Sequence, residues 1–127
     1  MISLSFLLIV CGAHFLADFG FQSRWMAQNK SSQLNALALH ILEYTTVLGI
    51  LTVVGCAIVN SCPLSLPALF LWVVANGLAH FVVDYFSSRA SKAAWGAGKE
   101  NLFWIIIGAD QLVHQICLFG LLVLLGG

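Results

Sequence analysis

Apolar residues are gathered into four long segments that are separated by shorter polar stretches. The segments cover roughly residues 2–21, 35–59, 66–87 and 102–125. A helix needs about 20 mostly apolar residues to cross the roughly 30 Å hydrocarbon core of a bilayer. Because backbone polar groups in that core must be satisfied within the segment, each span is expected to be a helix. The pattern predicts an all-α protein, a single four-helix transmembrane bundle made by residues 1–127.

The polar stretches between these segments predict three loops. QSRWMAQNKSSQ follows the first segment, NSCPLSLP follows the second, and SSRASKAAWGAGKEN follows the third. The opening MISLSFLLIVCG has the apolar character of a signal-peptide core. However, no Lys or Arg precedes it and no small-residue cleavage site follows it. We therefore expect this segment to be retained as the first helix.

The basic residues are restricted to two of the three predicted loops. Arg24 and Lys30 follow the first span, and Arg89, Lys92 and Lys99 follow the third. Loops of multi-pass membrane proteins that carry excess Lys and Arg face the cytoplasm. The first and third loops are therefore expected in the cytoplasm, with both termini outside. This is the arrangement of a multi-pass protein of a bacterial inner membrane.

The overall composition agrees with a membrane location. Hydrophobic residues make up 61% of the chain and charged residues only 8%, whereas soluble domains are about a quarter charged. The formal net charge is zero, so no nucleic-acid partner is indicated. The expected partners are the lipid bilayer and, because the chain is small, further copies of itself. None of the cysteines forms a CxxC pair, although Cys56 and Cys62 flank the loop expected outside, where a disulfide is compatible with the topology.

Histidine occurs once in every apolar segment, and in three of the segments an aspartate accompanies it. Each of these aspartates lies four residues from its histidine. Residues four apart lie on the same face of a helix. Counting along each span at about 1.5 Å per residue places these side chains in one layer, about 10 Å from the cytoplasmic end. The residues of this layer are His14, Asp18, His40, His80, Asp84, Asp110 and His114.

Ionisable side chains within a membrane are costly, by about 2.5–3.5 kcal/mol each. They are expected to face the bundle interior and to neutralise one another. Hydrogen bonds between His and Asp that link helices would explain one such pair, but a whole layer favours a shared cation. A divalent cation cancels carboxylate charge and binds neutral imidazole. We therefore predict that the seven residues hold one or two divalent ions, with Zn, Mn or Fe as suitable metals.

Residues beside the layer are candidates for supporting roles. Glu43 follows His40 by three residues, so it is expected to act as a ligand or, like Asp84, as a catalytic base, unless it only packs between helices. Lys30 is expected to contact an anionic lipid head group, unless it only sets the topology.

Two further polar side chains extend the helix faces that carry the layer. Gln22 follows Asp18 by four residues and Tyr44 follows His40 by four, so both are expected to hydrogen-bond the ligands. Gln111, next to Asp110, is expected to point elsewhere.

Several ordered blocks of the sequence resemble a family of small bacterial and phage membrane proteins of unknown function. The blocks are HFLADFGFQ (14–22), Lys30, LALHILEY (37–44), HFVVDYF (80–86) and ADQLVHQ (109–115). The resemblance covers nearly the whole chain but implies no established activity. Ser87 stands where that family often has a basic residue. The His/Asp layer is also similar, more distantly and by analogy only, to the sites of membrane-bound metal-dependent hydrolases.

The preferred functional hypothesis is a metal-dependent hydrolase acting on a lipid or lipid-linked substrate. A bound metal activates water and polarises the group to be cleaved, and the layer lies where a head group could reach it. A metal ion or proton conduit is an alternative, because ionisable residues in spans often mark ion paths. A haem-binding bundle with histidine ligands is another. The conduit is disfavoured because the spans are nearly apolar on the outer side of the layer.

Overall fold

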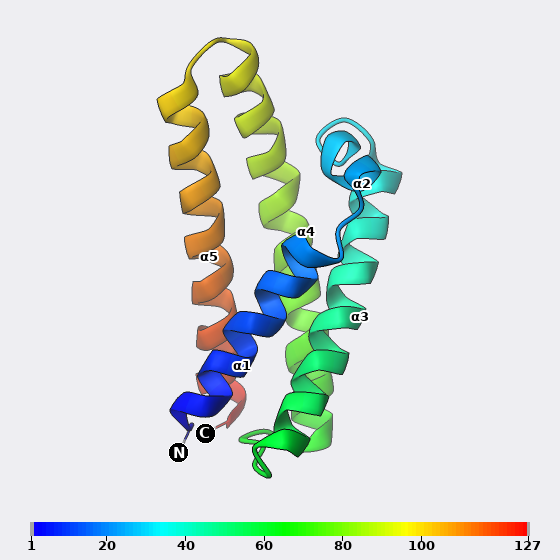
Figure 1. Cartoon of the computed structure of the whole chain (residues 1–127), viewed down its shortest axis with the longest axis vertical. Coiled ribbons are helices and arrows are strands. Elements are labelled where there is room, and N and C mark those ends of the chain that lie inside the picture. The colour runs from blue at the N-terminus through cyan, green and yellow to red at the C-terminus, as the bar shows by residue number, and fades with distance from the viewer. Residues whose placement is uncertain (1, 127) are drawn as a thin grey trace.

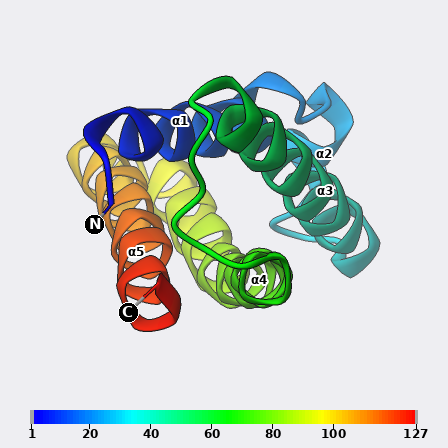
Figure 2. The same ribbon diagram turned by 90° about the horizontal axis from the view of Figure 1, so that it is seen from below.

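The computed structural model describes residues 2–126, which form helices and connecting turns without any strand (Figure 1). The elements are α1 (Leu4–Phe15), the π-helical turn η1 (Leu16–Gly20), α2 (Arg24–Asn29), α3 (Leu34–Ile58), α4 (Leu66–Gly96) and α5 (Glu100–Gly126). Helix α4 packs against both α5 and α3, whereas α1 runs obliquely and packs against α3 (Figure 2). The start of α1 and the end of α5 lie at the same end of the molecule, opposite α2 and the α4–α5 turn (Figure 1).

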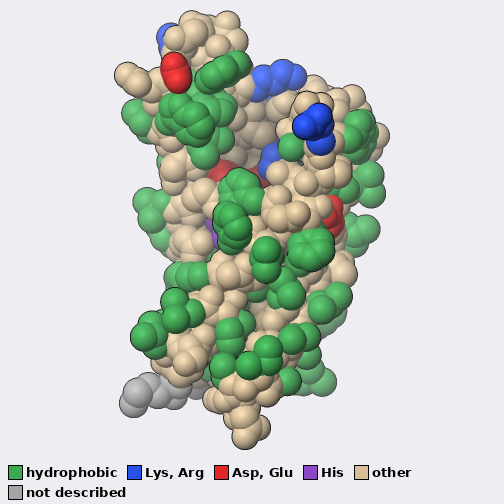
Figure 3. All heavy atoms as spheres, in the orientation of Figure 1, with side chains coloured by type: hydrophobic (Ala, Val, Ile, Leu, Met, Phe, Trp, Pro, Cys, Tyr) green, Lys and Arg blue, Asp and Glu red, His purple; other side chains and the backbone are tan. Residues whose placement is uncertain are grey.

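Three helices, α3, α4 and α5, are long and apolar enough to cross a membrane. The first predicted span is shorter, because the continuous helix of α1 and η1 covers only Leu4–Gly20. Large apolar side chains are exposed over the outer surface of the helices, as contact with lipid requires (Figure 3). The chain is therefore an all-helical multi-pass membrane protein in which three long helices are joined by a shorter one. The assignment of one end to the cytoplasm stays a prediction.

The prediction of a third loop at residues 87–101 is wrong for most of that stretch, which is helical. Helix α4 continues to Gly96, so only residues 97–99 connect it to α5. The segment after residue 87 is rich in alanine and contains no proline or glycine before Gly96, so it favours helix although it is too polar for the bilayer core. The helix ends where Gly98 takes φ +71°. There the Gly98 and Lys99 amides donate to the carbonyls of Trp95 and Ala94, at 3.0 and 2.9 Å, as in a Schellman cap.

The first polar stretch also contains a helix that the sequence pattern does not reveal. Helix α2 starts after Ser23, whose hydroxyl accepts a hydrogen bond from the Met26 amide at 3.2 Å. This side-chain cap satisfies one of the free amides at the helix start. The short helix lies beside the amino-terminal end of α3 (Figure 1). The cysteines Cys56 and Cys62 are free thiols in this structure.

A close contact between α3 and α4 sets the spacing of the polar layer. A Cβ atom added at Gly77 would overlap the Thr45 side chain, so only glycine lets the two helices approach this closely. Gly77 lies three residues before His80, and Thr45 lies five residues after His40. The contact therefore brings His40 and His80 together. On the side of the layer toward the chain ends, the interior is mainly apolar and includes Phe6, Val10, Leu48, Trp72, Leu118 and Leu122.

Candidate metal centre

The predicted histidines and aspartates come together in the interior, where four helical segments meet. His14 and Asp18 come from α1 and η1, His40 from α3, His80 and Asp84 from α4, and Asp110 and His114 from α5. All four histidines, Asp18 and Asp84 are at most 2% exposed, and the Asp110 side chain is 10% exposed. The neighbouring histidine rings lie in contact, and His80 stacks on His114 at a centroid distance of 4.1 Å. The layer is therefore one compact group of side chains.

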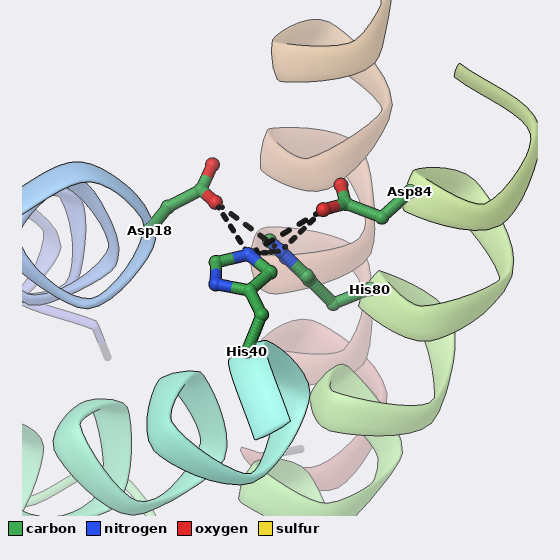
Figure 4. A group of neighbouring side chains, drawn as sticks. All are labelled: Asp18, His40, His80 and Asp84. Atoms are coloured by element: carbon green, nitrogen blue, oxygen red, sulfur yellow. Dashed lines mark hydrogen bonds and ion pairs between the residues drawn. The ribbon is translucent and has the colours of Figure 1, made fainter. Parts of the chain in front are cut away.

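One group of four atoms has the arrangement of a metal site (Figure 4). His40 Nε2 lies 3.2 Å from Asp18 Oδ1 and 3.4 Å from Asp84 Oδ2. His80 Nε2 lies 3.3 and 3.5 Å from the same two oxygens, and the two Nε2 atoms are 3.2 Å apart. Ligands bound at about 2.1 Å around a tetrahedral metal are separated by about 3.4 Å. Asp18, His40, His80 and Asp84, here named the first group, therefore converge at the spacing of tetrahedral ligands.

A second group shares one aspartate with the first. Asp18, Asp110 and His114 each offer a ligand atom, and these atoms lie within 4.8 Å of one another. His114 Nε2 is 3.4 Å from Asp110 Oδ2 and 3.2 Å from Asp84 Oδ1. The two oxygens of Asp84 thus face different histidines. In the second group Asp110 and His114 come from α5, whereas Asp18 comes from η1.

The π-helical turn of η1 determines which way Asp18 points. The Phe21 amide donates to the Leu16 carbonyl at 2.9 Å, five residues back, so this turn is wider than an α-helical one. In a regular helix Asp18 would lie over His14. Instead it faces His40 and His80, and His14 belongs to neither metal-type group. His14 is held by hydrogen bonds, from the Tyr44 hydroxyl to Nδ1 at 2.9 Å and from Nε2 to Gln111 Oε1 at 3.2 Å.

Gln111 is part of the cluster, contrary to the expectation that it points elsewhere. Its amide donates to Asp18 Oδ2 at 2.9 Å and to Asp110 Oδ2 at 3.1 Å. It precedes His114 by three residues, and residues three apart are neighbours on a helix surface. That spacing is the signal in the sequence that could have identified it. Gln111 joins His14 to the two carboxylates.

Lys30 reaches the cluster instead of pointing only toward the surrounding medium. Its Nζ forms an ion pair with Asp84 Oδ2 at 2.7 Å, and this oxygen belongs to the first group. The ion pair could not be predicted, because Lys30 lies in the turn after α2 and far from Asp84 in sequence. Ser87 donates a hydrogen bond to Asp110 Oδ1.

The other candidates lie around the cluster with different roles. Gln22 donates to the backbone carbonyl of Asp18 at 3.1 Å, so it supports the turn rather than a ligand atom. Tyr44 stacks on His80 at a centroid distance of 3.9 Å in addition to holding His14. Glu43 is half-buried and makes no hydrogen bond or ion pair with any residue among 2–126. The position facing the cluster is taken by Tyr44, one residue further along α3.

A cavity of about 620 Å³ opens onto the cluster. The carboxylates of Asp18, Asp84 and Asp110 line it, and Lys30 and Lys92 lie in its wall. The hollow is visible between the α4–α5 hairpin and α2, with acidic and basic side chains inside it (Figure 3). The other lining residues include the hydroxyl side chains of Ser87, Ser88 and Ser91 and the apolar side chains of Trp95, Phe103, Trp104 and Ile107.

The fold and the cluster together define a class, a multi-pass helical membrane protein with a buried His/Asp group that could hold a metal ion. The chain belongs to the family described as "Protein of unknown function (DUF3307)", whose sequence model matches residues 4–125. This match confirms the resemblance to a family of unknown function. No curated protein and no solved structure matches the chain.

Proposed function

We propose that the protein is a membrane-bound hydrolase that uses a divalent metal ion at the first group to cleave an anionic lipid or lipid-linked substrate. The observation that carries this proposal is the spacing of the four atoms of the first group. Two carboxylate oxygens and two imidazole nitrogens lie 3.2–3.5 Å apart in the contacts between histidine and aspartate. Zn, Mn and Fe all accept such a mixed set of ligands.

The charges of the layer support a divalent occupant. Asp18, Asp84 and Asp110 can carry three negative charges, and Lys30 is the basic residue paired with them. With neutral histidines, this leaves two negative charges in a buried environment, where unpaired charge is costly. One divalent cation would cancel both charges.

The cavity supports a substrate that is anionic at one end and apolar at the other. Lys30, Lys92 and Ser91 could bind phosphate or carboxylate oxygens, while Trp95 and Trp104 offer apolar surface to a chain or ring. Both kinds of residue line the same cavity as the aspartates of the cluster. A lipid head group could therefore reach the metal while its tail stays against the aromatic side chains.

The chemistry requires an activated water and a proton acceptor. A divalent ion lowers the pKa of bound water and polarises the bond to be cleaved. Asp84 remains the proposed base, because it lines the cavity and its Oδ1 contacts His114 instead of the histidines of the first group. We no longer assign this role to Glu43, which does not line the cavity. Gln111 and Lys30 would hold the carboxylates until metal and substrate bind.

The opposite side of the layer argues against a conduit. Beyond the histidines the interior is filled mainly by fully buried apolar side chains such as Leu48, Trp72 and Leu118. The buried polar side chains there are Thr52 and Asn76, and the Asn76 amide donates to a carbonyl of its own helix. An ion path needs polar groups on both sides of its binding site. A cavity that ends at the cluster suits a reaction better than passage.

Metal analysis of the detergent-purified protein tests the first part of the proposal. Wild type prepared without chelator should contain a divalent metal, and His80→Ala should lose it. Stably folded wild type that binds no Zn, Mn or Fe would refute the metal site and leave the histidines as hydrogen-bonding links between helices.

A lipid turnover assay tests the second part. Incubation with a bacterial lipid extract should consume one lipid species, and Asp84→Asn should abolish this turnover. Glu43→Gln is the matched control, since it also replaces one carboxylate by an amide but lies outside the cavity. Metal-loaded wild type that cleaves no lipid yet carries metal or protons across liposome membranes would overturn the hydrolase in favour of the conduit.

A further inference from the structure

The two carboxylate oxygens of Asp18 face different sets of side chains. Oδ1 lies 3.2 and 3.3 Å from the Nε2 atoms of His40 and His80 in the first group. Oδ2 accepts the amide of Gln111, and the same amide nitrogen also donates to Asp110 Oδ2. Asp18 thus belongs to both groups of ligand atoms. A carboxylate placed in this way can bind one ion through each oxygen.

The second group has its own converging ligands. His114 Nε2 lies 3.4 Å from Asp110 Oδ2, which is again the separation of about 3.4 Å expected for two ligands of one tetrahedral ion. His114 is 2% exposed, so the imidazole is fixed in a dry environment. Asp110 and Asp18 also line the cavity, so an ion held here would keep an open side toward a substrate.

The side-chain amide of Gln111 lies between the carboxylates of Asp18 and Asp110, where a second cation would bind. Its amide nitrogen lies 2.9 and 3.1 Å from oxygens of Asp18 and Asp110. Two carboxylates brought this near to one another need positive charge or N–H groups between them. The amide supplies the N–H groups, and an ion could replace it after a rotation of one flexible side chain.

We propose that the centre is dinuclear, with a second divalent ion bound by Asp18, Asp110 and His114, and with Asp18 bridging the two ions. This inference rests on the proposed metal ion at the first group. Carboxylate-bridged ions in two-metal sites lie about 3.5–4 Å apart and act together on the attacking and leaving oxygens of a phosphoester. A second ion would also give the floor of the cavity a net positive charge, which fits an anionic phosphoester as the substrate.

The number of ions per chain tests this proposal. Full-length wild type in detergent is loaded with Mn²⁺, freed of excess metal and analysed for manganese and protein. Two ions per chain are expected, and Asp110→Asn and His114→Ala should each reduce the number to one. Glu100→Gln, which removes a carboxylate from the exposed start of the same helix, should leave both ions in place.

Electron paramagnetic resonance of the same wild-type sample gives a test that needs no variant. Two bridged Mn²⁺ ions should give the spectrum of a spin-coupled pair, whereas separate ions give that of isolated Mn²⁺. One ion per chain, unaffected by Asp110→Asn, would overturn the second site and leave the proposed function standing. Two uncoupled ions would also overturn it, and the absence of any bound metal would overturn both proposals.

Discussion

Lys30 competes with any cation that binds the first group, because its ammonium lies 2.7 Å from Asp84 Oδ2. An ion bound to that oxygen at about 2.1 Å would lie about 4 Å from the ammonium. The repulsion between a single and a double charge at about 4 Å is about 2 kcal/mol even with the dielectric constant of water, and larger inside a protein. Lys30→Met should therefore tighten metal binding by at least about 30-fold, since about 1.4 kcal/mol corresponds to tenfold.

The measurement is a titration of the purified protein with Zn²⁺ in competition with a chelator of known affinity. Lys92→Met is the matched control, because Lys92 lines the same cavity but forms no ion pair with a residue among 2–126. Both variants lose one positive charge, yet only Lys30→Met should bind metal more tightly. An unchanged or weaker affinity in Lys30→Met would refute the argument that the ammonium and the metal use the same oxygen.

Three other predictions follow from the packing and the topology. Gly77→Ala should force α3 away from α4, which should lower the metal content and cost about 1–3 kcal/mol of stability. Gly108→Ala, whose added Cβ meets open space, should change neither quantity. Metal analysis and thermal unfolding measure the two effects. Tyr44→Phe removes a hydrogen bond to His14 and should cost about 1 kcal/mol of stability with metal content unchanged, and metal loss would contradict it. Reporter fusions after Cys62 should report from outside the cytoplasm and fusions after Gly98 from inside; the reverse result would refute the predicted orientation.

The helices and their shared polar layer could be predicted because both depend on local periodicity. Apolar length identifies α3, α4 and α5, and a spacing of four residues places His80 with Asp84 and Asp110 with His114 on shared faces. The same rule fails for His14 and Asp18, since the π-helical turn of η1 lies between them. No simple pattern in the sequence marks that wider turn.

Contacts between distant parts of the chain could not be predicted in the same way. The ion pair of Lys30 with Asp84 and the bonds of Gln111 to Asp18 join residues more than 50 positions apart. Such pairs depend on how the helices pack against one another, and the spacing of residues along one chain does not reveal this packing. The spacing of three residues between Gln111 and His114 indicates a shared helix face, but it does not identify the partners of Gln111 on other helices.

The error in the third loop also bears on the function. A short hydrophobic span followed by a loop would leave the polar layer close to the surface, with little protein around it. Because α4 extends to Gly96 and α5 begins at Glu100, the hairpin rises beyond the cluster and supplies Ser91, Lys92, Trp95 and Trp104 to the cavity wall. The segment that was too polar to be a membrane span is thus what encloses the space above the aspartates. A cavity with basic, hydroxyl and aromatic groups over a His/Asp cluster gives a substrate a place to bind, which a bare cluster of hydrogen-bonding links would not need.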